Sequence, residues 1–388
     1  MTFDFDAVID REGTLSTKWD SRKAVFGRSD VIPLWVADMD FASPPCVVEA
    51  LQRRASHPVY GYPARPNVLF EAVAGWFGRR YKTAVEPAWM TCVSGIVFGL
   101  HLALEAFSDP GDGIIIQPPV YHPFFYAVAN RKRRLIENPL RIVNGHYEMD
   151  FEDLKAKIDD RTRMLILCSP HNPVGRVWSR EELQELARIC LERNVMIVAD
   201  EIHGDLVYRS GGYVPFFTLS PEAARTSLTF ISGSKTFNLA GLFSSLALAP
   251  NPAIRKKFEA AVREIGQDQL NVFGIEALRA AYEDGDAWLD SLLAYLHGNA
   301  RYISDYLRDN VPPLSMTVPE GTYLGWIDCR GLEMTPEALN RLMIDRAGLG
   351  FNAGTLFGSE GAGFMRINFG CPRSVLEQAM TQLGDALR

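Results

Sequence analysis

Long apolar runs, paired cysteines and a surplus of basic charge are all missing from this sequence. No apolar run approaches the roughly 20 residues that span a membrane, and the six cysteines include no C-x-x-C pair. The net charge of -7 argues against a nucleic-acid-binding protein. The acidic start, MTFDFD, lacks the basic and apolar regions of a signal peptide. We therefore expect a cytoplasmic protein with reduced thiols, no metal site, and no membrane or nucleic-acid partner.

What the sequence does contain is a series of short apolar runs separated by helical patterns. The runs are residues 114–116, 164–168, 195–199 and 228–231, and a helical pattern covers residues 181–193. Continuous apolar strands joined by helices indicate βαβ units and a largely parallel sheet. The chain of 388 residues is long enough for two packed domains. We therefore predict an α/β fold with a mostly parallel central sheet.

Three polar side chains follow successive strands of this predicted sheet. Asn172 lies in SPHNPVG, Asp200 directly follows residues 195–199, and Lys235 lies in SGSKTFNLAG after residues 228–231. Ligands of parallel sheets bind beyond the carboxyl ends of the strands, so the three side chains are expected to converge on one planar ligand. Burial lowers the pKa of a lysine in a tight turn, and its amine then attacks carbonyls to form a Schiff base. From the residues alone, a turn-capping Asp200 and a solvated Lys235 stay open as alternatives.

These motifs, in this order, resemble the fold-type I pyridoxal-phosphate enzymes of the class I/II aminotransferase superfamily. Five further segments resemble its MalY/PatB branch, the cystathionine β-lyase-like C–S lyases: REGT at 11–14, LWVADMDF at 34–41, YGY at 60–62, PPVY at 118–121 and DEIH at 200–203. The resemblance covers residues 3–373 and implies the fold-type I transferase fold with pyridoxal 5'-phosphate as cofactor. It predicts an N-terminal arm with part of the small domain (1–45), a large cofactor-binding domain (46–285) and a smaller C-terminal α+β domain (286–388).

The resemblance assigns roles to the three strand-end residues. Lys235 is expected to bind the cofactor covalently and to act as the catalytic base. Asp200 is expected to keep the cofactor's ring nitrogen protonated, because a buried carboxylate favours the charged ring. Asn172 is expected to donate its amide to the phenolate oxygen of the ring. His203 lies where many aminotransferases carry a tyrosine that touches this oxygen, and we include it among the cofactor-binding residues.

Aromatic and substrate-binding residues follow from the same resemblance. Tyr121 is expected to stack on the cofactor ring and to take part in catalysis, with a plain core tyrosine as the alternative. His122 stands where the family often has a second tyrosine, so it is either a proton donor or a space-filling side chain. Arg366, between apolar neighbours, occupies the superfamily's carboxylate-binding context. Ala37 of LWVADMDF is also expected to contact the substrate.

The cofactor's phosphate is expected at a helix N-terminus. Gly95 and Ile96 open the helical run that continues to residue 107, where free backbone N–H groups face an anion. Ser232 and Ser234 are expected to add hydroxyl groups. Tyr62 resembles a tyrosine that related enzymes contribute across a dimer interface, and a homodimer is therefore expected.

The activity implied by the resemblance is β-elimination from L-cystathionine or a related cysteine thioether, which yields a thiol, pyruvate and ammonia. Eight residues after Lys235, where several aminotransferases have a phosphate-binding arginine, the chain has Phe243. This difference favours the lyase over a simple aspartate aminotransferase. Transamination stays open as the second reading, and a regulatory binding protein with incidental lyase activity as the third.

Overall fold

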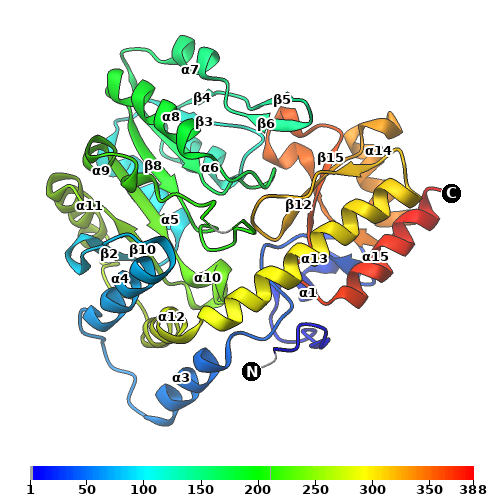
Figure 1. Ribbon diagram of the computed structural model, residues 1–388, viewed down its shortest axis with the longest axis horizontal. Helices are drawn as coiled ribbons and strands as arrows, with labels where there is room; N and C mark the ends of the chain where they lie inside the picture. Colours follow the sequence, from blue (N-terminus) through cyan, green and yellow to red (C-terminus); the bar gives the residue numbers. More distant parts are fainter. Residues whose placement is uncertain (1–2, 210) are drawn as a thin grey trace.

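The four apolar runs form neighbouring strands at the centre of a seven-stranded sheet (Figure 1). The computed structural model describes residues 3–209 and 211–388. The strand order is β2-β10-β9-β8-β7-β3-β4. The bounds are Met90–Val93 (β2), Gly113–Ile116 (β3), Arg134–Glu137 (β4), Thr162–Cys168 (β7), Met196–Asp200 (β8), Ser227–Ile231 (β9) and Ser245–Leu248 (β10). All pairs are parallel except those of β10, which runs antiparallel to β9 and β2. The predicted mostly parallel sheet is therefore confirmed.

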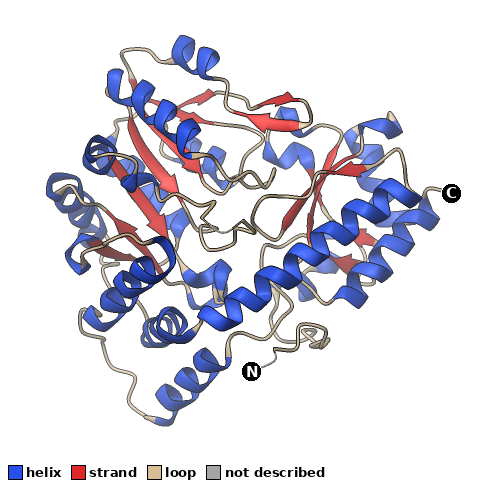
Figure 2. Cartoon of the chain, in the orientation of Figure 1, coloured by secondary structure: helices blue, strands red, loops and turns tan. Residues whose placement is uncertain are grey.

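Helices cover both faces of this sheet, because successive side chains of each buried strand point to opposite sides (Figure 2). Ile114 and Ile116 pack in one apolar cluster with α5 (Ile96–Phe107), α6 (Pro123–Asn130) and α11 (Pro252–Glu264). Ile115 belongs to the cluster on the other face, with α7 (Phe151–Lys157), α8 (Arg180–Glu192) and α9 (Pro221–Thr226). The arrangement has three layers, and the strands are apolar on both sides, as the sequence predicted.

The strand ends are in register at the edge where the polar residues follow. Cys168 at the end of β7 pairs with Asp200 at the end of β8, and Asp200 pairs with Phe230 in β9. The short helix α10 (Gly233–Thr236) begins just beyond β9. Because the three strands end at the same level, the segments that follow them meet at one place.

A second, antiparallel sheet lies in the C-terminal part of the chain. Its order is β11-β12-β15-β14, with bounds Ser315–Met316, Leu324–Asp328, Phe364–Asn368 and Asn352–Ala353. The long helix α13 (Asp286–Asn310) runs alongside α15 (Arg373–Ala386) in this part of the molecule (Figure 1). The fold is thus a large α/β sheet structure with a smaller α+β part, as predicted, whereas the exact boundaries at 45/46 and 285/286 stay a prediction.

The N-terminal arm pairs with the C-terminal part. Its strand β1 (Ile32–Pro33) lies parallel to β13 (Leu349–Gly350). The other helices and strands are α1 (Thr17–Asp20), α2 (Arg22–Phe26), α3 (Pro45–Ser56), α4 (Asn67–Tyr81), β5 (Arg141–Val143), β6 (His146–Glu148), α12 (Val272–Asp284) and α14 (Pro336–Arg341). Within residues 3–209 and 211–388, no helix combines the length and apolar character that a membrane crossing needs.

Candidate active site

A cavity of about 380 Å³ opens at the carboxyl ends of β7, β8 and β9. It brings together most of the residues that the sequence singled out: Ala37, Gly95, Ile96, Tyr121, Asn172, Asp200, His203, Ser234 and Lys235. Cys168, Ser94, Phe243, Ser244 and Ser245 also line it. Segments from six distant parts of the chain therefore enclose a single space.

Lys235 enters the cavity from α10, a single helical turn. Ser232 begins this turn, and its hydroxyl accepts a hydrogen bond from Ser234 N at 3.1 Å. Lys235 Nζ donates to the carbonyl oxygen of Ala37 at 2.7 Å. Burial lowers the pKa of the amine to about 8, although the charges of Asp38 and Asp200 act in the opposite direction. The amine is therefore close to the point where it loses its proton at neutral pH, as nucleophilic and basic roles require.

Asp200 is the last residue of β8, and its carboxyl group is buried. Burial raises the pKa of this group to about 7, while a hydrogen bond from Ile202 N to Oδ1 at 3.2 Å and the charge of Lys235 lower it. A cationic ring placed beside this carboxyl would restore its charge. The group is thus suited to hold a protonated heterocycle.

The raised pKa of Asp200 predicts how the stability of the cofactor-free protein depends on pH. The folded chain keeps a proton on Asp200 up to about pH 7, whereas the unfolded chain loses it near pH 4. The free energy of unfolding should therefore fall as pH rises from about 4 to about 7, by about 2–4 kcal/mol from this group. Asp200→Asn should flatten this part of the curve in urea denaturation. An equally steep fall in the variant would contradict the assignment.

Arg366 and Asn172 form a second polar group beside the cavity. Arg366 is on β15, is buried, and donates from Nη1 to Asn172 Oδ1 at 3.0 Å. Its Nη2 donates to Asn352 Oδ1 and to Trp35 O, both at 2.7 Å, and its buried Nε has no hydrogen-bond partner. Because Asn172 Oδ1 accepts from Arg366, the Asn172 amide nitrogen is left to donate elsewhere. An unpaired buried guanidinium N–H indicates a place for an anionic ligand.

Three ring side chains of the site have pKa values shifted toward their neutral forms. Burial lowers the pKa of His203 to about 3 and that of His122 to about 4, and it raises the pKa of Tyr121 to about 12. The Nδ1 atoms of both histidines are buried without a partner. Tyr121 and His203 line the cavity. His122 lies beside Tyr121, with ring centroids 5.4 Å apart, but packs against Phe357.

The N-terminus of α5 closes the far end of the cavity. Gly95 is its N-cap, and a Cβ atom at this position would meet no atom within 4 Å, so the space beside it is open to a ligand. Ser94, Ile96 and Ser234 also line the cavity. Free N–H groups at a helix start favour an anion. Phe243, the residue in place of an arginine, lines the same region.

Several predicted residues lie outside the cavity lining. Ser232 Oγ donates to Ser244 O at 2.8 Å and caps α10, so Ser234 and Ser244 supply the lining hydroxyls instead. Tyr62 does not line the cavity, and its side chain is 96% exposed. Arg366 and His122 lie next to the lining rather than in it.

The sequence did not single out Tyr323, Asn352 or the backbone of residues 35–39. Tyr323 donates to Ala37 O at 2.9 Å, and Asn352 accepts from Arg366. Asn352 could not be identified from the sequence, because an isolated asparagine carries no pattern. The contacts to the backbone of residues 35–39 could not be predicted, because they do not depend on which side chains these residues carry.

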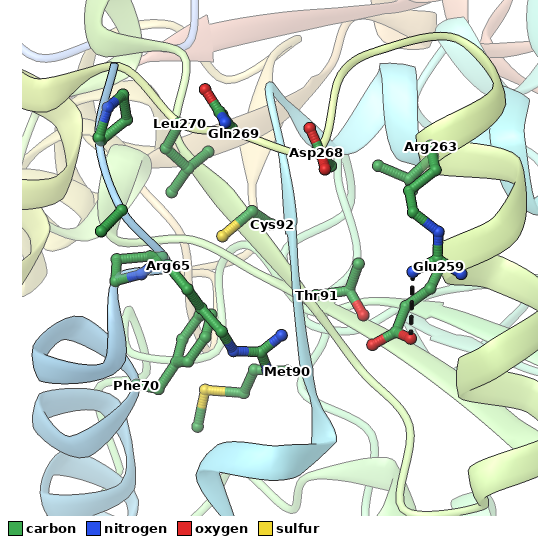
Figure 3. Close-up of a pocket in the computed structure, with 14 residues that line it drawn as sticks. Arg65, Phe70, Met90, Thr91, Cys92, Glu259, Arg263, Asp268, Gln269 and Leu270 are labelled. Atoms are coloured by element: carbon green, nitrogen blue, oxygen red, sulfur yellow. Dashed lines mark ion pairs between the residues drawn. The ribbon is translucent and has the colours of Figure 1, made fainter. Parts of the chain in front are cut away.

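A separate cavity of about 200 Å³ lies near β2 and α11 (Figure 3). It is lined by residues that include Arg65, Cys92, Glu259, Arg263 and Asp268, and none of the predicted site residues contributes to it. Arg263 pairs with Glu259 at 3.8 Å. This second cavity therefore has no part in the chemistry expected from the sequence.

A mostly parallel α/β sheet with a lysine and a buried carboxyl group in one cavity, and a buried arginine beside it, is suited to binding an anionic substrate and to forming a Schiff base with a carbonyl group. The sequence matches the family Aminotransferase class I and II over residues 29–383, and the chain belongs to this family. Cystathionine beta-lyase PatB of Bacillus subtilis is 40% identical, with 99% of each chain covered. Protein MalY of Escherichia coli is 34% identical, with 100% of this chain and 99% of its relative covered.

Solved structures agree with this assignment. Cystalysin from Treponema denticola, whose crystal structure contains pyridoxal 5'-phosphate, superposes with a TM-score of 0.96 and 36% identity over 100% of this chain and 99% of that one. The pyridoxal-phosphate-bound C–S lyase from Staphylococcus hominis has a TM-score of 0.93 and 31% identity, with 100% and 98% covered. The resemblance and the fold predicted from the sequence are confirmed.

Proposed function

We propose that the protein is a pyridoxal-phosphate-dependent C–S β-lyase that converts L-cystathionine or a related cysteine thioether into a thiol, pyruvate and ammonia. The observation that carries this proposal is the placement of Lys235 and Asp200 in one cavity. The relatives named as cystathionine β-lyase and as C–S lyase support the reaction class.

The residues present fit the cofactor. Lys235 offers an amine with a lowered pKa, Asp200 a buried carboxyl group, and the start of α5 an open anion site. Asn172 has a free amide nitrogen, and His203 Nδ1 is buried without a partner. When bound, pyridoxal phosphate supplies a carbonyl carbon for the substrate amine and a ring that accepts the electron pair released at Cα.

The side chains of this chain perform the remaining steps. The Arg366 guanidinium binds the substrate α-carboxylate, and Asn172 fixes the guanidinium through its 3.0 Å contact. Lys235 Nζ removes the Cα proton, which its lowered pKa favours. Asp200 would hold negative charge near the ring nitrogen of the bound cofactor and would favour its protonated form. The Cβ–S bond then breaks, and the sulfur takes up a proton and leaves as a thiol. Addition of one water molecule to the remaining three-carbon fragment gives pyruvate and ammonia.

Elimination predicts sustained product release without a second substrate. The purified protein, supplied with L-cystathionine and no 2-oxo acid, should form pyruvate and free thiol in equal amounts over many turnovers. Both products are measured together, by lactate dehydrogenase coupling and by thiol titration. A visible cofactor band that bleaches once without thiol release and returns only with an added 2-oxo acid would instead assign transamination, the activity named in the Pyrococcus aspartate aminotransferases that are about a quarter identical.

We also propose a cytoplasmic homodimer in which Tyr62 completes the phosphate site of the partner subunit. Its nearly full exposure, beside exposed Val59 and Tyr60, supports a role outside its own subunit. The six free cysteines fit a reducing compartment.

Mixing two inactive variants tests the shared site. Tyr62→Ala and Lys235→Ala proteins, unfolded and refolded together in equal amounts, should recover about a quarter of wild-type activity, because half the dimers are mixed and each has one intact site. Each variant refolded alone is the control. No recovery in mixtures that sediment as dimers would contradict the shared site.

A further inference from the structure

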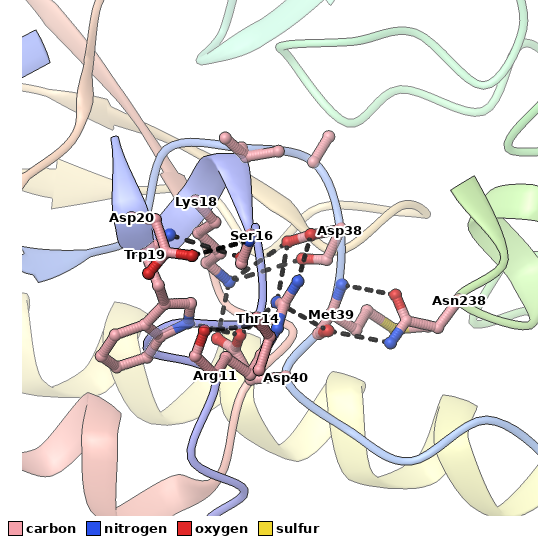
Figure 4. Close-up of polar contacts among 12 residues, drawn as sticks. Arg11, Thr14, Ser16, Lys18, Trp19, Asp20, Asp38, Met39, Asp40 and Asn238 are labelled. Carbon is pink, nitrogen blue, oxygen red and sulfur yellow. Dashed lines mark hydrogen bonds and ion pairs between the residues drawn. The ribbon is translucent and has the colours of Figure 1, made fainter. Parts of the chain in front are cut away.

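Four charged side chains of the N-terminal arm form a compact group, here called the arm cluster: Arg11, Lys18, Asp38 and Asp40 (Figure 4). Arg11 binds Asp38 through Nη2 at 2.7 Å and Asp40 through Nη1 at 2.6 Å. Lys18 Nζ lies 2.6 Å from Asp40 Oδ2 and 3.8 Å from Asp38 Oδ1. The Lys18 side chain is fully buried. Two positive and two negative groups thus balance one another, as buried ions require.

The arm cluster is attached to a stretch of backbone that faces the active site, residues 35–39, here called the wall segment. Five consecutive carbonyl oxygens of this segment accept hydrogen bonds from side chains. The donors are Arg366 to residue 35, Asn368 to residues 36 and 38, Lys235 and Tyr323 to residue 37, and Asn238 to residue 39. Lys235 and Arg366, the two cationic side chains of the site, therefore both donate hydrogen bonds to main-chain oxygens of the wall segment.

The position of these oxygens depends on the arm cluster, because Asp38 and Asp40 belong to, or directly follow, the wall segment. Arg11 Nη1 also donates to Met39 O at 3.3 Å, and Lys18 Nζ to Asp38 O at 3.5 Å. The same cations thus bind both the carboxylates and the backbone of the segment. On its other side, Asn238, three residues after Lys235, accepts from Met39 N at 3.0 Å.

A second link between the arm cluster and Lys235 is electrostatic. Burial lowers the pKa of the Lys235 amine, and the negative charge of Asp38 is the largest influence in the opposite direction. The other charged or titratable groups around the amine are Asp200 at the end of β8, His203 just after it, Arg366 on β15, and Tyr323 before β12. Arg11, which is bound to Asp38, partly cancels the field of that carboxylate.

We propose that the arm cluster holds the wall segment in place and thereby positions Lys235 Nζ and the Arg366 guanidinium. Asp38 also serves as the negative counter-charge of the Lys235 amine. Arg11, Lys18, Asp38 and Asp40 are positioning residues in this arrangement, because they act through the backbone oxygens and through charge. The kinetic part of this inference rests on the proposed lyase reaction; its electrostatic part rests on the chain alone.

Two single variants separate the charge of the arm cluster from its structural role. Asp38→Asn removes the negative charge near Lys235, so the amine should lose its proton at a pH lower by about 0.5–1 unit. Arg11→Gln removes the positive charge that partly cancels the charge of Asp38. The midpoint, the pH at which half of the Lys235 amine is protonated, should therefore rise. A purely structural loosening would move both variants in the same direction. Arg11 is 21% exposed, and Lys18 still pairs with Asp40 when Arg11 is replaced, so Arg11→Gln keeps the test available if Asp38→Asn fails to fold. An unchanged midpoint in Arg11→Gln would then overturn the counter-charge role.

The midpoint is measured on the full-length, cofactor-free chain by competitive acetylation with acetic anhydride across pH, followed by mass spectrometry of the Lys235 peptide. Asp38→Glu, which keeps the charge, should stay near wild type. The matched control is Asp30→Asn, which removes an exposed partner of Arg28 in the same arm and should change nothing. Opposite shifts in Asp38→Asn and Arg11→Gln support the proposal. Equal or absent shifts overturn the counter-charge role.

The positioning role has its own readout in the cofactor-loaded protein. Displacement of Trp35 O and of Arg366 should raise KM for L-cystathionine about 10-fold in Arg11→Gln, with a smaller change in kcat. A KM equal to that of Asp30→Asn would overturn the positioning role. Because the acetylation midpoint needs neither cofactor nor substrate, a failure of the proposed lyase function would leave the electrostatic test intact and would be recognised separately.

Discussion

Lys235→Ala is expected to reduce turnover of L-cystathionine by at least about 10⁴-fold, because it removes both the covalent anchor of the cofactor and the base. The visible absorbance of lysine-bound cofactor should disappear as well. The measurements are the absorbance spectrum of the protein incubated with pyridoxal phosphate and the rate of pyruvate formation.

A matched variant and a chemical rescue make this result specific. Lys256→Ala replaces an exposed lysine of α11 and should keep the spectrum and the rate. Methylamine added to Lys235→Ala should restore part of the activity, since the shortened side chain leaves room for a small amine. Retained turnover together with a retained visible band would refute the role of Lys235 outright.

Asp200→Asn is expected to lower kcat by about 10³-fold. A carboxylate close to a cationic ring nitrogen contributes on the order of 4 kcal/mol at an effective dielectric constant near 20, and an amide of the same shape contributes no net charge. The measurement is steady-state kinetics with saturating pyridoxal phosphate, so that weaker cofactor binding does not hide the effect on the chemical step.

The neighbouring carboxyl group serves as the control for Asp200. Glu201 is equally buried, but it accepts hydrogen bonds from Phe216 N at 2.8 Å and from the Tyr213 hydroxyl, away from the cavity. Glu201→Gln should therefore keep kcat within about a factor of three, although it affects stability. If both variants lost activity equally, a general effect of burying an amide at the end of β8 would explain the result better than a contact with the ring.

The central sheet and the chemistry at its edge could be predicted because both leave a mark on the sequence. Strands buried on two faces must be apolar throughout, as residues 164–168 are, and polar groups directly after them must lie at the sheet edge. Asn172, Asp200 and Lys235 follow from this rule. Their roles toward pyridoxal phosphate came from family resemblance.

Other parts of the site could not be predicted, for physical reasons. The carbonyl oxygen that receives Lys235 belongs to Ala37, 198 residues earlier, and every residue type has such an oxygen. The sequence did not show that the Ser232 hydroxyl begins α10 and donates to Ser244 O, and its predicted contact with the phosphate stays a prediction. The antiparallel direction of β10 also could not be predicted, because the apolar pattern of a buried strand does not depend on its direction in the sheet.

The antiparallel course of β10 has a consequence for protein engineering. The segment from 232 to 244 leaves the sheet after β9 and returns along the adjacent strand, so both of its ends are anchored side by side. Lys235 and Asn238 of this segment donate to the carbonyl oxygens of Ala37 and Met39, so extra residues inserted there would move Lys235 relative to the cavity. Peptide tags, insertions or new chain termini should therefore be tolerated poorly between Ser232 and Ser244, and much better in the exposed hairpin turn between β5 and β6.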